Sequence, residues 1–140
     1  MQRPWCLLEM YTAIEAKMPI IAINIAGKGY DFAAATNFLT HLDTALDAVN
    51  PGACDLLRSK GVEPEDVAFK LSSVLPLIIS VPFNSSASAN AIQAALADIV
   101  ETMISAAPVT IAETREEWLQ TRVWSSLQVV IRAPRGLFRL

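Results

Sequence analysis

The sequence predicts an α/β fold in which helices flank a parallel sheet, and three observations lead to this class. Two short β-branched runs, at 19–25 and 77–81, are apolar on both faces, as strands are when helices cover both sides of a parallel sheet. Segments with helical periodicity stand before, between and after these runs. Alternating helices and strands are typical of parallel sheets with right-handed crossovers, so we expect the two strands to lie parallel in one sheet.

The first predicted helix covers residues 4–17. Pro4 suits a first helical turn, where no backbone N–H is needed. Apolar residues then recur at helical spacing, at Leu7, Met10, Tyr11 and Ile14. One face of this helix therefore belongs to a core. The first strand, PIIAINI, follows at 19–25, and AGKGYD after it forms a loop.

Asp31 caps the next predicted helix, which runs to about Val49. Its apolar stripe consists of Phe32, Ala35, Leu39, Leu42, Leu46 and Val49. This spacing is typical of a helix with one face on a core. The NPG turn at 50–52 ends the helix.

Two more helices are predicted before the second strand. The first covers 53–60 and stops at Gly61, and the second begins at Pro64 and ends before Pro76. The core residues of the second are Val67, Leu71 and Val74. The second strand is expected from Leu77 to Val81.

The most regular helix is predicted from Ser86 until Pro108. Its expected core positions are Ile92, Ala95, Leu96, Ile99, Val100, Met103 and Ile104. Because these residues fill every inward position of three turns, we expect this face to be buried.

Residues 108–140 form a helical or partly disordered tail in this interpretation. A helix from Thr114 to about Val130 is predicted, and its apolar residues are Trp118, Trp124, Leu127 and Val130. These side chains can dock on the domain or bind a partner, and docking is the default expectation. The final PRGLFRL is expected to be disordered or to contact an anionic surface.

Composition excludes several classes of protein. A chain of 140 residues fits one domain, and 53% of its residues are hydrophobic while 18% are charged. The apolar runs are shorter than the roughly 20 residues of a membrane span, and the first of them carries Glu9 and Glu15, unlike a signal peptide. A net charge of −3 gives no support to nucleic-acid binding. Cys6 and Cys54 form no disulfide framework, so we expect a reduced, cytoplasmic compartment.

The two predicted strands are too few for a stable sheet. Parallel strands need neighbours that cover their edges, and a two-stranded sheet is marginal in water. We therefore expect the sheet to be incomplete, with its N-terminal strands encoded before Met1 or supplied by another chain. Whether Met1 is the true start decides between these alternatives.

The segment WCLLEMYTAI, followed by the strand PIIAINI, resembles the third helix and fourth strand of TIR (Toll/interleukin-1 receptor) domains. Plant and other eukaryotic members carry a Trp-Cys-Leu-x-Glu-Leu motif. Trp5, Cys6, Leu7 and Glu9 match it, and Met10 replaces the final leucine. The later segment KGVEPEDVAFKLSSVLPLIISVPFNSSASANAIQAAL also resembles TIR-like proteins of lower eukaryotes. The resemblance covers about 2–106 and implies that 1–107 form the C-terminal portion of a TIR-like, flavodoxin-like domain.

Glu9 is the candidate catalytic residue. Judged from the residues alone, it lies off the core stripe in line with Trp5 and Ala13, which indicates an exposed helical glutamate. The resemblance implies a different role, because the glutamate of this motif is catalytic in TIR domains that are NAD⁺ glycohydrolases or cyclases. A carboxylate can stabilise the positive charge that develops on ribose when the nicotinamide bond breaks. NAD⁺ would be a substrate, and no cofactor is implied.

Other candidate residues favour structural roles. Gly27-Lys28-Gly29 lacks the spacing of phosphate-binding loops, so an ordinary strand-to-helix loop is the better interpretation. His41 is the single histidine and has no partners at metal-ligand spacing. Cys6 lies near a helix start that could lower its pKa, but a buried structural thiol is the commoner case. A loop and helix cap are expected at Asn84, Ser85, Ser86 and Ser88.

Three functions from different classes follow from the sequence. The first is a signalling module that self-associates with other TIR domains through the helices at 31–49 and 86–106. The second is an NAD⁺ glycohydrolase or cyclase with Glu9 catalytic, which needs the rest of the domain. The third is a truncated, nonfunctional fragment. We rank the interaction module first.

Overall fold

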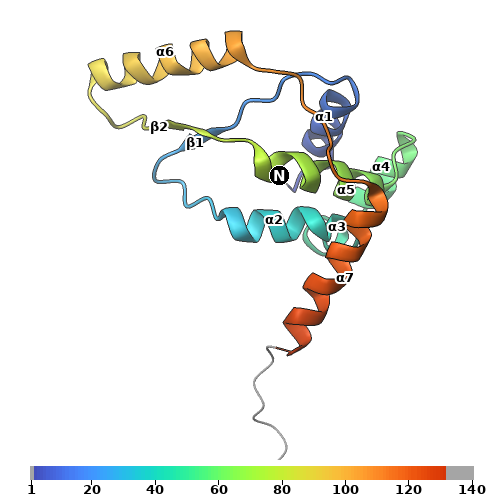
Figure 1. Cartoon of the computed structure of the whole chain (residues 1–140). Coiled ribbons are helices and arrows are strands. Elements are labelled where there is room, and N and C mark those ends of the chain that lie inside the picture. The colour runs from blue at the N-terminus through green and yellow to red at the C-terminus, as the bar shows by residue number, and fades with distance from the viewer. Residues whose placement is uncertain (1, 132–140) are drawn as a thin grey trace, which may run out of the picture.

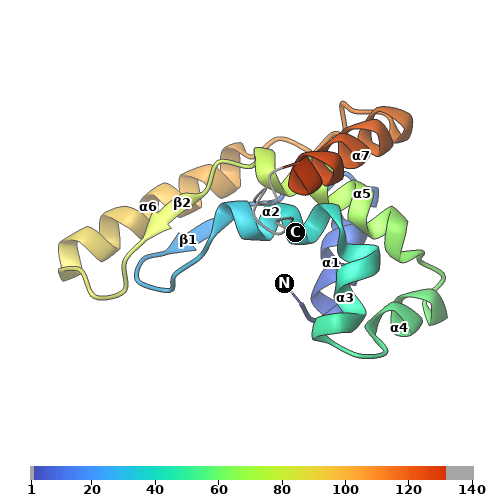
Figure 2. The same cartoon turned by 90° about the horizontal axis from the view of Figure 1, so that it is seen from below.

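The computed structural model describes residues 2–131, with side chains as far as Val123, and Figure 1 shows a group of helices from which an arm projects. In chain order the elements are α1 (Pro4–Glu15), β1 (Ile23–Ile25), α2 (Phe32–Thr40), α3 (Leu42–Val49), α4 (Ala53–Ser59), α5 (Pro64–Val74), the 3₁₀ helix η1 (Leu75–Leu77), β2 (Val81–Phe83), α6 (Ala89–Ser105) and α7 (Arg115–Ile131). We call α1 to α5, η1 and α7 the helical body, and β1, β2 and α6 the arm. Figure 2 shows the arm extending to one side, with α6 running along β2.

The hydrophobic core lies in the helical body, with α5 at its centre. This helix packs against α1, α2, α3, α4 and α7. The buried apolar residues are Leu7, Ile14, Leu39, Leu42, Leu46, Ala53, Cys54, Leu57, Val67, Ala68, Leu71, Val74 and Trp118. Burying one large aliphatic side chain contributes about 1.5–3 kcal/mol, so this cluster is the main source of stability.

The boundaries of α1, α4 and α5 follow the sequence signals closely. Pro4 and Pro64 each open a helix, and Gly61 ends α4 with a positive φ of 76°. Leu7 and Ile14 are buried, as the spacing predicts. The first helix ends at Glu15, two residues earlier than expected.

The helix predicted over 31–49 is in fact two helices, because the backbone leaves the helical path at His41, with φ −113° and ψ 25°. The hydroxyl of Thr40 donates to the carbonyl of Thr36 at 2.9 Å, and that of Thr44 donates to the carbonyl of His41 at 3.0 Å. Such side-chain bonds to backbone carbonyls bend helices. Apolar periodicity alone did not reveal this break.

Part of the predicted apolar stripe on α2 and α3 is correct. Leu39, Leu42 and Leu46 are buried, but Phe32 and Val49, at the two ends, are exposed. Asp31 caps α2 as expected, since its side chain accepts a hydrogen bond from the Ala34 N–H at 2.9 Å. The core therefore uses the middle of this segment.

The two strands pair in parallel, as predicted. The aligned pairs are Ile23 with Val81, Asn24 with Pro82, and Ile25 with Phe83. Only 23–25 of the predicted 19–25 is strand, and the expected burial on both faces is wrong, because Ile23 and Ile25 are exposed. Among the described elements, no helix contacts β1 as extensively as α6 contacts β2.

The second strand begins later than predicted. Instead of a strand over 77–81, the chain forms η1 and then β2 at 81–83. Pro76 sits in the 3₁₀ turn, which the Ile78 N–H closes by donating to the carbonyl of Leu75 at 3.2 Å. Leu77 and Ile79 are consequently exposed instead of buried.

The expected burial of α6 is wrong. Ser88 caps this helix, but none of its residues is buried. Ile92, Ala95 and Ile99 are half-buried, in the helix that contacts β2. Four further predicted core residues are exposed: Leu96, Val100, Met103 and Ile104.

In the part of the chain that the structure describes, no helix combines the length and apolar character that crossing a bilayer demands.

The predicted docking of the tail helix is confirmed for Trp118. Thr114 and Glu117 form a capping box at the start of α7, since each side chain accepts a hydrogen bond from the other's backbone N–H. Trp118 is buried, and its ring lies 5.5 Å from that of Phe69, between centroids. Arg115 also pairs with Asp66 of α5. The side chains of Trp124, Leu127 and Val130 and the PRGLFRL end lie outside the described residues.

Candidate functional site

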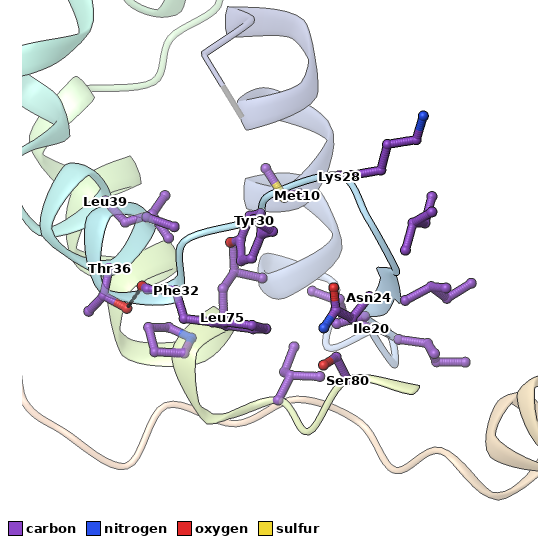
Figure 3. A pocket seen from close by; sticks show the side chains of 17 residues that line it. Met10, Ile20, Asn24, Lys28, Tyr30, Phe32, Thr36, Leu39, Leu75 and Ser80 are labelled. Carbon is purple, nitrogen blue, oxygen red and sulfur yellow. Dashed lines mark hydrogen bonds between the residues drawn. The ribbon is translucent and has the colours of Figure 1, made fainter. Parts of the chain in front are cut away.

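A cavity of about 410 Å³ lies between the arm and the helical body. Its walls are residues 20–25, Lys28 and Tyr30 of the loop after β1, one side of α2 from Phe32 to Leu39, Met10 of α1, and Leu75, Pro76, Ile78 and Ser80. Figure 3 shows Asn24 and Ile20 on one side and Phe32, Thr36 and Leu39 on the other. The volume falls within the range that holds a small ligand or a few residues of peptide.

The cavity lining is mainly apolar. Tyr30 and Phe32 contact each other edge to face, with ring centroids 4.8 Å apart, and burial raises the pKa of the Tyr30 phenol. The Thr36 hydroxyl donates to the carbonyl of Phe32 at 2.9 Å, and the other polar side chains of the lining are Asn24, Lys28, Tyr30 and Ser80. None of the lining residues is a carboxylate, histidine or cysteine. The apolar lining suits the cavity to binding, and Lys28 and Tyr30 are the ionisable side chains among its lining residues.

Glu9 lies on the exposed face of α1, as its helical position predicts. The cavity is lined by its neighbour Met10 and not by Glu9. Trp5, one turn earlier, is also exposed, and the Lys60 ammonium lies 5.2 Å from the centre of its ring. The described residues thus bring Trp5 and Glu9 onto one exposed helix surface without enclosing the carboxylate.

The two cysteines have different environments. Cys6 is exposed, so the expected buried thiol is wrong for this residue. Cys54 is buried, and burial raises the pKa of its thiol. The backbone N–H of Cys54 donates to the Asp47 carboxylate at 3.0 Å, and this hydrogen bond lowers the pKa of Asp47. Cys54 and Asp47 therefore hold α4 against α3.

The remaining candidates occupy ordinary structural positions. The Gly27-Lys28-Gly29 segment is the loop from β1 to α2, and both glycines have positive φ, at 75° and 64°. His41 lies at the break between α2 and α3, with Nδ1 3.0 Å from the Asn37 carbonyl oxygen. Within the described part of the chain, no group of three or more acidic, histidine or cysteine side chains is placed to hold a metal ion.

The loop before α6 also serves a structural purpose. The Asn84 side chain accepts a hydrogen bond from the Ser86 N–H at 3.0 Å, and the Ser88 hydroxyl accepts one from the Ala91 N–H at 3.4 Å. These contacts order the loop and start the helix, as the sequence predicts. Neither side chain forms part of a catalytic group.

The arm carries an extended apolar surface that the sequence did not predict. Its exposed large residues are Ile23, Ile25, Leu96, Val100, Met103 and Ile104. The last four form what we call the α6 stripe, because a spacing of four, three and one places them on one side of a helix. Contiguous exposed apolar surface of this kind marks interaction sites.

The two edges of the sheet differ in their hydrogen-bonding capacity. The Val81 N–H donates to the Ala22 carbonyl at 2.9 Å, and the Ala26 N–H donates to the Phe83 carbonyl at 2.8 Å. In a parallel pair, alternate residues face the partner strand, so the N–H and C=O groups of Ile23 and Ile25 face outward. The outward-facing residue of β2 is Pro82, which has no N–H to offer. A proline in a predicted strand indicates that one edge of the strand cannot donate a hydrogen bond. Which edge Pro82 blocks became clear only from the pairing of β1 with β2.

No protein-family model, curated protein sequence or solved structure matches this chain.

Proposed function

We propose that this chain is a signal-transduction interaction module that acts in the cytoplasm by self-association, as its resemblance to TIR domains implies. The observation that carries the proposal is the exposed apolar surface of the arm, above all the α6 stripe. A 17-residue helix without a buried residue contributes little to the stability of one copy. Its apolar side chains become stabilising when a second copy covers them.

The magnitudes favour a surface contributed by both copies. Fully burying a large apolar side chain contributes about 1.5–3 kcal/mol. The four residues of the α6 stripe are 48–82% exposed, so covering what remains would supply roughly 4–7 kcal/mol from one copy. Association itself costs roughly 4–15 kcal/mol in translational and rotational freedom. One stripe offsets only the lower part of this range, whereas two stripes together offset most of it.

The finer fold that we propose is a flavodoxin-like sheet, of which β1 and β2 are two neighbouring strands. The parallel pairing supports this proposal, since parallel sheets occur almost entirely in α/β proteins with helices on both faces. Further strands beside β1 would cover Ile23 and Ile25, which are exposed in the described structure.

The NAD⁺ glycohydrolase role of Glu9 stays a prediction of the resemblance. An active site needs a carboxylate beside an enclosed ribose, whereas Glu9 is exposed and does not line the cavity beside β1. No contact of Glu9 favours this function over the interaction module, which we therefore place first.

Sedimentation velocity over a wide concentration range tests the proposal. We expect the wild-type chain to show a reversible increase in mass with concentration. The Leu96→Glu, Val100→Glu double variant should weaken this association, because it places charges in the α6 stripe. The Asn90→Glu, Gln93→Glu double variant is the matched control, since both residues are exposed and polar on the same helix.

Two outcomes would count against the proposal in different ways. A wild-type chain that is folded but monomeric at every concentration contradicts self-association as the function. Equal association of the wild type and the Leu96, Val100 variant removes the α6 stripe from the interface.

A further inference from the structure

We propose that the cavity binds a small, uncharged aromatic molecule that carries one polar group, as a phenol or an indole does. This goes beyond self-association, because it assigns a ligand to a space that no residue of α6 lines. The inference depends on three features: the position of the cavity, two polar side chains on one of its walls, and the aromatic rings on the opposite wall.

The cavity lies between one face of the β1–β2 pair and α2. Continuing the register of Ile23 with Val81 back by one residue places Ala22 opposite Ser80. Alternate side chains of a strand share a face, so Ala22, Asn24 and Ser80 belong to the same face, and all three line the cavity. Strands added beside β1 would extend the sheet at its edge, and would therefore border this space without occupying it.

Asn24 and Ser80 place hydrogen-bonding groups on an otherwise apolar wall. They are diagonal neighbours on this face, and both are half-buried. Among the described residues, neither side chain has a hydrogen-bond partner. A carboxamide offers donors and an acceptor, and a hydroxyl offers both. One hydroxyl or ring N–H of a ligand can therefore bond to this pair while the rest of the molecule contacts apolar side chains.

Phe32 and Tyr30 favour an aromatic ligand. Their rings meet edge to face, with centroids 4.8 Å apart. In Figure 3 the Phe32 side chain extends from the α2 side toward Asn24 and Ser80. Aromatic rings prefer offset-stacked or edge-to-face contacts with one another, so a further ring can add to this pair. A ligand ring against Phe32 would bring its polar group to the Asn24 amide.

The lining favours a ligand without charge. Apart from Lys28, no charged side chain lines the cavity, and Lys28 extends away from the other labelled side chains in Figure 3. A charged ligand would lose its hydration without gaining an opposite charge. The volume of about 410 Å³ lies near the lower end of the range for ligand pockets, which suits a molecule of one or two rings.

The test uses three fluorescent probes that share a two-ring body. 2-Naphthol carries one hydroxyl, naphthalene has no polar group, and 2-naphthoate is an anion at neutral pH. A fluorescence titration with the full chain measures the binding of each probe. We expect saturable binding of 2-naphthol and much weaker binding of 2-naphthoate, because the cavity offers no counter-charge.

A variant of the polar pair tests the hydrogen bond. Asn24→Leu keeps the approximate size of the side chain and removes its amide. It should weaken the binding of 2-naphthol by about twofold to tenfold, as expected for one neutral hydrogen bond, and should not weaken the binding of naphthalene. Asn90→Leu is the matched control, because Asn90 is exposed on α6 and does not line the cavity.

A second variant tests the position of the ligand. Ala35→Trp fills the cavity from α2 and should abolish the binding of 2-naphthol. Ala34→Trp is the matched control, since Ala34 is exposed on the same helix and does not line the cavity. Far-UV circular dichroism verifies that each variant keeps its helical content.

The inference is overturned if 2-naphthol shows no saturable binding to the wild-type chain, or if 2-naphthoate binds equally well. Unchanged binding to a folded Ala35→Trp variant would place the ligand elsewhere, for example on the α6 stripe. Equal effects of Asn24→Leu on 2-naphthol and naphthalene would contradict the hydrogen bond. The comparison of the three probes uses the unaltered protein, so a failure of either variant to fold does not affect it.

Discussion

The indole N–H of Trp118 donates a hydrogen bond to the hydroxyl of Ser72 at 2.8 Å, and this contact joins the last described helix to the centre of the core. Trp118 is the only aromatic member of the buried cluster among the described residues. Its position explains how α7 stabilises the helices that precede it in the chain.

Replacing Trp118 with alanine should destabilise the protein by about 3–5 kcal/mol, because a large buried side chain leaves a cavity in the core. Urea unfolding followed by circular dichroism measures the change. Trp5→Ala is the matched control, since Trp5 is 54% exposed and should cost less than about 1 kcal/mol. Equal destabilisation by the two changes would contradict the docking of α7.

Asp47 should contribute to stability in a manner that depends on pH. The hydrogen bond from the Cys54 N–H lowers the pKa of Asp47 in the folded state. A lowered folded pKa gives stability that is present above the unfolded pKa, about 3.9, and is lost as the pH falls through the folded value. We expect Asp47→Asn to reduce the acid sensitivity of unfolding below about pH 4.

Urea unfolding at a series of pH values tests this expectation, and Asp55→Asn is a suitable control because Asp55 is exposed on the neighbouring helix α4. If both variants keep the acid dependence of the wild type, the Asp47 hydrogen bond has no role in it.

The two thiols should react at very different rates. Cys6 is exposed on α1, whereas Cys54 is buried and the pKa of its thiol is raised. Since the thiolate is the reactive form, a maleimide should label Cys6 in the folded protein and Cys54 only after unfolding. Mass spectrometry of a time course measures both, and Cys6→Ser identifies the fast site. Rapid labelling of Cys54 in the folded chain would contradict the packing of α4.

NAD⁺ turnover by this chain should equal the enzyme-free blank, and Glu9→Ala should not change it. The physical reason is the exposure of Glu9, which leaves the carboxylate in water, where it has little effect on a developing charge. Chromatographic detection of released nicotinamide measures the reaction, and Glu15→Ala is a control on the same helix. Turnover that disappears in Glu9→Ala alone would instead support the enzymatic role.

Local signals in the sequence predicted much of the helical body. Pro4, Pro64 and Gly61 set helix boundaries through the restricted or permitted angles of their own backbones, so no tertiary information was needed. Threonine hydroxyls bond to carbonyls on both sides of the break at His41, and the same kind of bond occurs within the unbroken helix α6. The same residues are compatible with a straight helix, so the sequence pattern could not distinguish the two.

The candidate sites were harder to predict, because they depend on what lies opposite each residue. Leu96 and Leu46 occur in equally convincing apolar patterns, yet Leu46 packs in the helical body and Leu96 faces solvent. Periodicity shows that a face is apolar and not which element covers it. The cavity beside β1 likewise requires the positions of α2 and η1, which sequence spacing does not specify.

The pairing of Ile23 with Val81 also has a consequence for the order of folding. These strands are joined by a long stretch that includes α2 to α5, so their contact closes a large loop, at a cost in chain entropy. Contacts within the helix-rich stretch between them are more local and form sooner. The sheet can close only after α5 and η1 have been synthesised, and until then a nascent chain leaves β1 without its strand partner. During this interval β1 is open to chaperones that recognise extended apolar segments.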